Sequence, residues 1–206
     1  IARRQRQMCI RDSNGAGAAD RVRCRPLETF PLSCFNRAAA AVALLLAASA
    51  CSPTFNWREL RVDGTPLLAL LPCKAESATR PVPLTGAGAP PSELHMHSCE
   101  AGDLRFAVAW ADVGQATQVA PALSAWRSAG LQAIRASGSD WSAALAGAEA
   151  LQGVQAQGTD PQGHAVQTRA LYFARGTQVF QAAVYGPRLP DEVLDAFFSG
   201  LQLAAP

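Results

Sequence analysis

Residues 164–185 read HAVQTRALYFARGTQVFQAAVY, and this stretch decides the fold. Two segments rich in Val, Leu, Tyr and Phe, which favour strands, are separated by Arg175-Gly176. The pattern predicts an antiparallel hairpin with strands over 164–174 and 177–185. Immediately before it, Thr159–Gly163 contains a proline, which fixes φ, and a glycine that is free to take positive φ. The last third of the chain therefore predicts antiparallel β-structure that is entered through a tight turn.

Five further strands are expected between Trp57 and Ala111. Leu67–Leu71 is a continuous apolar run, which predicts a strand covered on both faces. Ala78–Leu84 holds two prolines, which cannot donate to a sheet ladder, so this strand is expected at a sheet edge. A Gly/Pro loop is predicted over Gly86–Pro91. The remaining strands are predicted at Trp57–Val62, Glu93–Cys99 and Leu104–Ala111, the last two as a hairpin around the Gly102-Asp103 turn.

Helices are predicted where apolar residues recur at three- and four-residue steps. Thr117–Ser137 shows this spacing. The Ala-rich segment Trp141–Gly153 follows it less regularly and is predicted as a helix that leads into a strand near Val154. Pro190-Asp191-Glu192 predicts the start of a final helix that stops near Gly200. This order of elements predicts an α+β fold in which helices pack on an antiparallel sheet.

An uncharged run, Ala38–Ala50, follows Arg37. Its 13 residues would reach only about 20 Å as a helix, which is too short for a hydrocarbon core of about 30 Å and typical of a secretory signal. Ala48-Ser49-Ala50-Cys51 resembles the lipobox of bacterial lipoproteins. The resemblance implies diacylglycerol on the Cys51 sulfur, cleavage before Cys51 and acylation of the new amino terminus. An ordinary cleaved signal, in which Cys51 is incidental, is the alternative.

The expected organisation is a leader, a signal, a tether and one domain. Residues 1–36 hold six arginines between positions 3 and 23 and no apolar periodicity, which predicts a disordered leader. Within this leader, Arg4–Ser13 resembles a translated library-adapter artefact, and a basic nucleic-acid-binding arm is the alternative. We expect residues 37–50 to be the lipoprotein signal peptide, 51–56 a tether, and 57–206 a single α+β domain.

Charge and cysteine content agree with export. From position 51 onward there are 10 basic and 13 acidic residues, a net charge of −3, which removes the electrostatic case for nucleic-acid binding. Cys73 and Cys99 are then the two cysteines left beside the expected lipidation site. An even pair in an exported chain predicts a disulfide, with two buried free thiols as the alternative.

Five motifs of the expected domain look like a family of uncharacterised bacterial lipoproteins with a PsbP-like domain. They are Trp57-Arg58-Glu59, Leu70-Leu71-Pro72-Cys73-Lys74, Phe106-Ala107-Val108-Ala109-Trp110-Ala111, Asp160-Pro161-Gln162-Gly163 and Phe197-Phe198-Ser199-Gly200-Leu201. The resemblance implies an α/β/α sandwich, although Cys73 stands where PsbP-like strands often carry glycine. The resemblance implies no catalytic residues, because PsbP-like domains mostly act as binding or assembly accessories.

Two groups of residues could carry chemistry. Glu93, His95, His97 and Cys99 alternate along one expected strand, so they share a face, and His-x-His is a pattern that metal sites use. The simpler interpretation is a solvent-facing strand surface. His164 stands beside Asp160 and could form a triad with Ser139, Ser142 or Ser199, but there is no Gly-x-Ser-x-Gly elbow. The sequence therefore assigns no catalytic, cofactor-binding or metal-binding residue, and we expect no enzyme activity and no cofactor.

The first functional hypothesis is a lipid-anchored accessory or binding lipoprotein of the bacterial cell envelope. It would face the periplasm, contact the membrane through its lipid anchor and act on an envelope protein partner, without binding nucleic acid. Ser52 after the lipidated cysteine is, by family analogy, an outer-membrane sorting residue. The alternatives are a metal-binding protein or metalloenzyme that uses His95 and His97, and a purely structural envelope protein.

Overall fold

The computed structural model describes residues 54–85 and 90–204. Two units are distinguished along the chain, residues 1–51 and residues 52–206, and all the described residues belong to the second. The described elements are β1 (Arg58–Arg61), β2 (Leu67–Leu71), β3 (Glu76–Val82), β4 (Ser92–Ala101), β5 (Leu104–Asp112), α2 (Ala116–Ala133), β6 (Gly138–Trp141), β7 (Glu149–Thr159), β8 (Ala165–Arg175), β9 (Gln178–Gly186), α3 (Asp191–Ser199) and β10 (Gln202–Leu203). The prediction of an α+β fold is confirmed.

Seven antiparallel strands form the larger sheet, in the order β3-β4-β5-β9-β8-β7-β6. Its centre is the predicted hairpin, β8 and β9, in which Phe173 pairs with Phe180 and Gly176 takes a φ of 61° in the turn. The β4–β5 hairpin is also confirmed, with Gly102 at a φ of 58°. As predicted from the prolines of this segment, β3 lies at a sheet edge, with Pro81 in the strand and Pro83 just after it.

Three antiparallel strands form the smaller sheet, in the order β1-β2-β10. Leu67, Ala69 and Leu71 of β2 are buried, whereas the residues between them are only half-buried. The expectation that β2 is covered on both faces is therefore wrong, because one face of this sheet has no layer packed over it among the described residues. β10 was not predicted; it pairs with β2 at Gln202 and Leu203.

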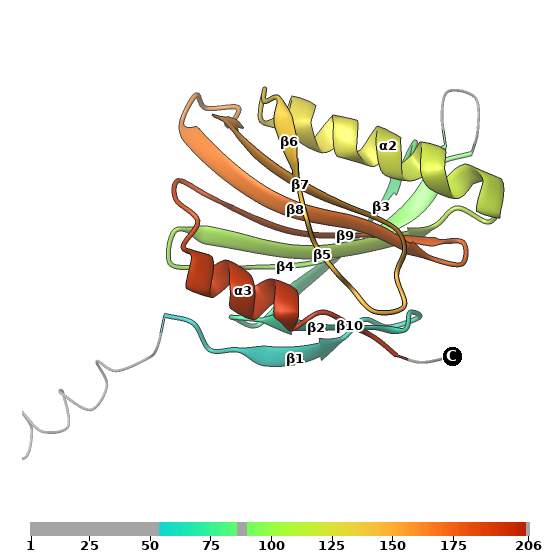
Figure 1. Ribbon diagram of the computed structural model, residues 1–206, viewed down its shortest axis with the longest axis horizontal. Coiled ribbons are helices and arrows are strands. Elements are labelled where there is room, and N and C mark those ends of the chain that lie inside the picture. The colour runs from blue at the N-terminus through green and yellow to red at the C-terminus, as the bar shows by residue number, and fades with distance from the viewer. Residues whose placement is uncertain (1–53, 86–89, 205–206) are drawn as a thin grey trace, which may run out of the picture. The chain divides into compact units, whose positions relative to one another are not determined.

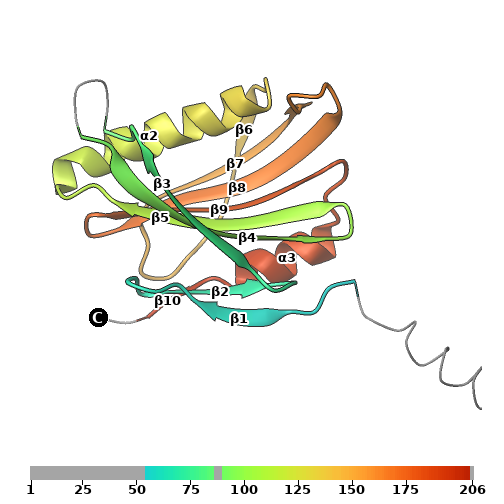
Figure 2. The same cartoon turned by 180° about the vertical axis from the view of Figure 1, so that it is seen from behind.

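The elements form layers around the larger sheet (Figures 1 and 2). α2 lies on one face, and α3 and the smaller sheet lie on the other. The core under α3 and the smaller sheet is built around Phe106, Phe180 and Phe197, and the rings of Phe106 and Phe197 are 5.5 Å apart. Under α2 the sheet presents small side chains such as Ala109 and Ala183, against which Leu123 and Trp126 pack.

The predicted helix over Trp141–Gly153 is wrong. The segment consists of the last residue of β6, a connection over residues 142–148, and the start of β7. Gly147 has a φ of 78° and Ala150 a φ of 52°, and the β7–β8 register shifts between Glu149 and Gln152. Left-handed residues interrupt a helix, so the alanine spacing reflects small residues packed along a strand and a loop rather than a helical face.

The helix predicted over Thr117–Ser137 is confirmed in type, but it ends earlier. α2 stops at Ala133, with Ile134 as its C-cap, and Arg135 takes a φ of 51°. The Arg135 N–H donates to the Gln132 carbonyl and the Ala136 N–H to the Leu131 carbonyl, both at 3.0 Å. This pattern is a helix-terminating Schellman motif with arginine at the position that glycine usually takes.

The predicted disulfide is present. Cys73, which follows β2 of the smaller sheet, is bonded to Cys99 in β4 of the larger sheet. The final helix is also confirmed, with Pro190 as its N-cap and Gly200 as its C-cap. In the part of the chain that the structure describes, neither helix is long and apolar enough to cross a membrane.

Several expectations fall outside the described residues. They concern the leader over 1–36, the signal peptide over 37–50, the lipid-attachment residue Cys51 and most of the Gly86–Pro91 loop. Phe55 and Asn56, which were expected to belong to the tether, contact the domain. The Phe55 ring lies 6.4 Å from that of Phe106, and the Asn56 N–H donates to the Pro72 carbonyl at 2.7 Å.

Candidate functional site: a polar cleft beside Arg169

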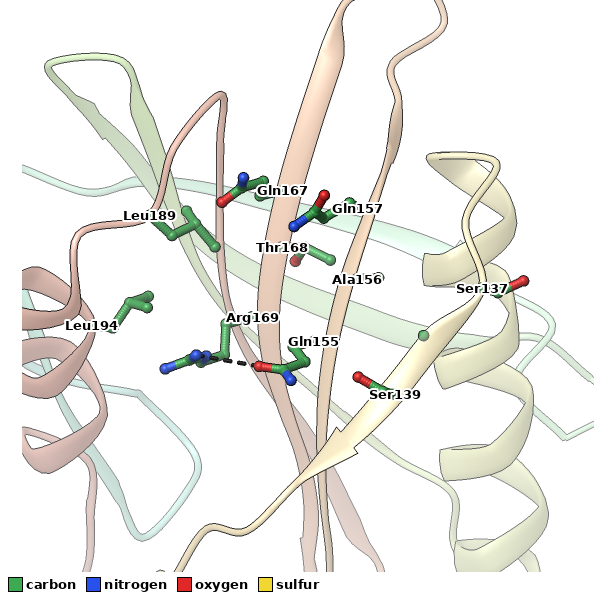
Figure 3. A pocket seen from close by; sticks show the side chains of 11 residues that line it. Ser137, Ser139, Gln155, Ala156, Gln157, Gln167, Thr168, Arg169, Leu189 and Leu194 are labelled. Atoms are coloured by element: carbon green, nitrogen blue, oxygen red, sulfur yellow. Dashed lines mark hydrogen bonds between the residues drawn. The ribbon is translucent and has the colours of Figure 1, made fainter.

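A cleft of about 510 Å³ opens on the larger sheet between α3 and β6 (Figure 3). This volume is within the range of small-molecule sites. Ser139, Gln155 and Arg169 form one row across β6, β7 and β8, because Ser139 pairs with Gln155 and Gln155 pairs with Arg169. Paired residues of an antiparallel sheet project from the same face. The cleft is lined by Ser137, Gly138, Ser139, Gln155, Ala156, Gln157, Gln167, Thr168, Arg169, Leu189 and Leu194.

The cleft is polar because its floor lies beside, and not beneath, the elements that cover this face of the larger sheet. α3 covers the central strands, where Leu171 and Phe173 of β8 belong to the core. Further along β8, Gln167 and Arg169 continue the same alternation beyond the cover. The face that is apolar under α3 is therefore polar where it opens to solvent.

Arg169 is the central side chain of the cleft. Its Nη2 donates to Gln155 Oε1 at 3.2 Å, an interaction drawn in Figure 3. Its Nη1 is 4.0 Å from Asp191 Oδ1, which is beyond hydrogen-bond distance. The Arg169 side chain is only 27 % exposed, whereas that of Asp191 is 87 % exposed. The guanidinium is thus sheltered, and its acidic neighbour is a loosely held surface side chain.

Trp141, the last residue of β6, supports Arg169. The guanidinium carbon lies 5.4 Å from the centroid of the Trp141 ring, within the range of a cation–π contact. The indole Nε1 donates to the Ala170 carbonyl at 3.3 Å, and Phe198 packs edge-on at 5.2 Å. Gly153 makes room for the indole, since a Cβ atom there would lie 3.0 Å from the ring. The stack of Gly153, Trp141 and Arg169 fixes the charge over the floor of the cleft.

The two histidines of the expected metal face do not converge. His95 Nδ1 is 3.1 Å from the Thr79 hydroxyl and His97 Nδ1 is 2.9 Å from the Ser77 hydroxyl, so each imidazole faces its own partner on β3. In residues 54–85 and 90–204, no group of three or more His, Cys, Asp or Glu side chains could hold a metal ion. Cys99 is bonded to Cys73 and carries no thiolate. The structure therefore adds no third ligand to the pair.

The face that carries these histidines is not fully solvent-facing. Cys99 is buried, and His95 is half-buried and stacks on Trp110 with their centroids 4.5 Å apart. Burial lowers the pKa of His97, while the charge of Asp63 raises it and that of His95 lowers it. The simple expectation of a solvated strand surface is corrected, because the smaller sheet begins to cover β4 at this end.

His164 lies on the exposed turn before β8. Its Nδ1 is 3.1 Å from Asp160 Oδ2, and its backbone N–H donates to Asp160 Oδ1 at 2.8 Å. Within the described part of the chain, none of its hydrogen bonds reaches a serine. The pair caps the turn that the sequence predicts, and Ser139, Ser142 and Ser199 lie on other elements, β6, the following loop and α3.

A buried polar cluster lies on the opposite face, beneath α2. Gln181 Nε2 donates to the Tyr172 hydroxyl at 2.9 Å, and the Thr168 hydroxyl donates to the Val184 carbonyl at 3.1 Å. Burial raises the pKa of Tyr172, so the phenol stays neutral. Gly130 of α2 leaves space for it, because a Cβ atom there would lie 2.7 Å from the Tyr172 oxygen. The polar groups of this cluster are therefore bonded to each other and to the backbone.

A second cleft, of about 540 Å³, includes His95 and Trp110 at the other end of the sheet. It is bordered by Thr85 and Pro90, the residues on either side of the undescribed segment 86–89, so its outline is incomplete. The cleft beside Arg169 has a wall that is described throughout. It is the candidate site.

Sequence reasoning missed this cleft because its residues come from four separate segments that only the strand register brings together. One signal was present. Gln167 and Arg169 share the alternation phase of Leu171 and Phe173, so polar residues occupy the phase of this predicted strand that is otherwise apolar.

Comparisons with known proteins assign no family: no family model, no curated protein and no solved structure matches the chain.

Proposed function

We propose that this chain is a lipid-anchored accessory protein of the bacterial cell envelope, which faces the periplasm and binds a ligand or an envelope partner in the cleft beside Arg169. The observation that carries the binding role is the cleft itself. It combines one sheltered guanidinium with neutral hydrogen-bonding side chains and an apolar wall from Leu189 and Leu194. Specific small-molecule sites commonly have such a composition of a few polar groups in a defined concavity.

The envelope location is supported by two features. Ala48-Ser49-Ala50-Cys51 resembles a lipobox, and the run before it has the length of a signal-peptide core. The Cys73–Cys99 disulfide is of the kind that persists in oxidising compartments such as the periplasm. The sorting residue Ser52 favours the outer membrane. A single acyl chain holds a protein to a membrane only reversibly, so the proposal requires two or more chains on Cys51.

A binding role is favoured over catalysis by the chemistry of the cleft wall. The residues that line it include no histidine, cysteine or carboxylate, so the wall offers no paired nucleophile and base. The layered arrangement, with α2 on one face of the larger sheet and α3 on the other, is compatible with the α/β/α sandwich of PsbP-like accessory proteins. We propose that likeness as the finer description of the fold.

The test is mass spectrometry of the native chain from bacterial membranes, beside a Cys51→Ser variant. The proposal predicts an amino-terminal peptide that begins at Cys51 and carries two or more acyl chains, and a variant that lacks them. It also predicts that protease added to cells with a permeabilised outer membrane degrades the domain. Cytoplasmic control proteins should stay intact, because the inner membrane protects them. An unacylated native chain that still carries residues 1–50 would refute the envelope assignment.

A further inference from the structure

We propose that the cleft recognises a carboxylate, held by paired hydrogen bonds from the Arg169 guanidinium. The inference rests on the proposed binding function, because it names the chemistry of the ligand that the cleft takes. The ligand carries this carboxylate next to amide or hydroxyl groups. A peptide carboxyl terminus and an acidic sugar both have this chemistry.

The first argument is that Arg169 has unused donors. A guanidinium has five N–H donors, and the hydrogen bond to Gln155 uses one of them. Among the described residues, no fully buried side-chain nitrogen or oxygen lacks a partner, so the Arg169 nitrogens that have no partner keep access to solvent, and the Arg169 side chain lines the cleft. A planar guanidinium with free parallel donors matches the two oxygens of a carboxylate.

The second argument is that the guanidinium is held in place before any ligand arrives. Trp141 lies beneath it, and Trp141 is itself fixed by its hydrogen bond to the Ala170 carbonyl and by Phe198. Gln155 fixes one edge of the fork. A long arginine side chain normally loses rotamer freedom when it binds, and this support removes part of that cost.

The third argument concerns charge. Arg169 is the single charged residue in the wall of the cleft, and the Asp191 carboxylate at 4.0 Å already offsets part of its field. A phosphate group near pH 7 carries a charge of about −1.5 to −2, which one partly neutralised guanidinium balances poorly. A carboxylate carries a single negative charge. The cleft is therefore matched to a carboxylate rather than to a phosphate.

Asp191 also predicts in which direction the affinity for a carboxylate ligand should change when its own charge is removed. Among the described residues it is the carboxylate nearest to the Arg169 guanidinium, and its side chain is 87 % exposed and free to move away. A ligand carboxylate must compete with it. Removing the Asp191 charge should tighten binding, whereas removing the Arg169 charge should weaken it.

The neutral side chains of the cleft suit the rest of such a ligand. Ser139, Gln155, Gln157 and Gln167 line it and supply both donors and acceptors. Amides and hydroxyls next to the ligand carboxylate would be satisfied by these groups. The cleft offers no aromatic face for stacking, because Trp141 is already covered by Arg169 on the cleft side.

The experiment is calorimetric titration of the purified full chain in a non-ionic detergent with two matched pairs of probes. One pair is N-acetyl-Ala-Ala as the free acid and as the carboxamide, and the other is glucuronate and glucose. We expect the acid of at least one pair to bind at least about tenfold more tightly than its neutral partner, as for a hydrogen bond to a charged group. The pair that shows the difference identifies the source of the carboxylate as a peptide end or an acidic sugar.

Four variants test whether Arg169 is the residue that binds the ligand carboxylate. Arg169→Gln should lose the preference for the acid, and Arg169→Lys, which keeps the charge without the fork, should retain only part of it. Asp191→Asn should tighten binding of the acid severalfold. Arg105→Gln is the matched control, because Arg105 is an exposed arginine paired with Glu100 on the β4–β5 hairpin; its binding should be unchanged.

Equal affinity for the acid and the neutral probe in both pairs would overturn the inference, as would an acid preference that survives in Arg169→Gln. Thermal unfolding of each variant is recorded beside the titration. If Arg169→Gln does not fold, the Asp191→Asn variant tests the inference. An affinity for the acid that is lower than or equal to that of the wild-type protein would contradict the competition between Asp191 and the ligand carboxylate. The intact mass of the same preparation reports Cys51 acylation, so a failure of the anchor and a failure of carboxylate binding are seen separately.

Discussion

Loss of the Cys73–Cys99 bond should destabilise the domain by an amount that its place in the fold allows us to calculate. The bond closes a loop of 26 residues. Chain-entropy estimates for a loop of this length give about 3.5 kcal/mol, since the cross-link restricts the unfolded chain. For a domain of this size, 1 kcal/mol corresponds to about 2–4 °C, so Tm should fall by roughly 7–14 °C.

The assay is urea unfolding of a protein that begins at Ser52. It is measured once with the disulfide intact and once after the disulfide has been reduced under native conditions. With a slope of roughly 2 kcal/mol/M, the midpoint of the reduced protein should lie about 1.7 M lower. A Cys73→Ala/Cys99→Ala variant provides the second measurement. Cys99 is buried, so this variant also loses core contacts and should be somewhat less stable than the reduced protein.

The single variants sharpen the test. Either substitution alone removes the whole cross-link, so the cost of the double variant should be far smaller than the summed costs of Cys73→Ala and Cys99→Ala. The reasoning would be refuted if the free energies of unfolding of the reduced and oxidised proteins differed by less than about 1 kcal/mol. Such a result would mean that the unfolded chain is already compact between residues 73 and 99, or that side-chain packing alone holds the two sheets together.

Three further predictions concern local features. Burial lowers the pKa of His97 below 6.5, so protonation favours the unfolded chain and stability should fall as pH drops below about 6.5; His97→Asn should flatten this part of a Tm-against-pH curve, and an unchanged slope would contradict it. Gly153→Ala should cost about 1–3 kcal/mol in urea unfolding, because the added methyl meets the Trp141 carbonyl oxygen as well as the Trp141 indole, and wild-type stability would contradict that close approach. Arg135→Gly should raise the free energy of unfolding by up to about 1 kcal/mol, because it relieves a left-handed residue, whereas Arg135→Val should lower it.

Much of the fold could be predicted because its signals are local. The β8–β9 hairpin is set by β-forming residues around one glycine turn, and α3 by Pro190 and two acidic residues at its start. The disulfide follows from cysteine number and the expectation of export. Each of these predictions depends on residues that lie close in sequence or on a count.

The failures are positions where tertiary contacts decide. Between Trp141 and Gly153 the spacing of alanines and leucines fits a helix, but Gly153 is needed beneath the Trp141 ring, and Ala150 is held in a left-handed conformation at a bulge. β10 has only two residues and forms because β2 offers a free edge. The Arg169 cleft depends on the register of three strands and on how far α3 extends. Neither property can be predicted from a single segment of the sequence.

The pairing of β10 with β2 bears on the order of synthesis. β2 is the middle strand of the smaller sheet, and its partner residue for Leu68 is Gln202, 134 positions later. A growing polypeptide can therefore assemble the β4–β5 hairpin and the β1–β2 pair while the ribosome is still at work, but the smaller sheet is completed only when β10 has been synthesised. Until then the edge of β2 that β10 occupies has no strand partner.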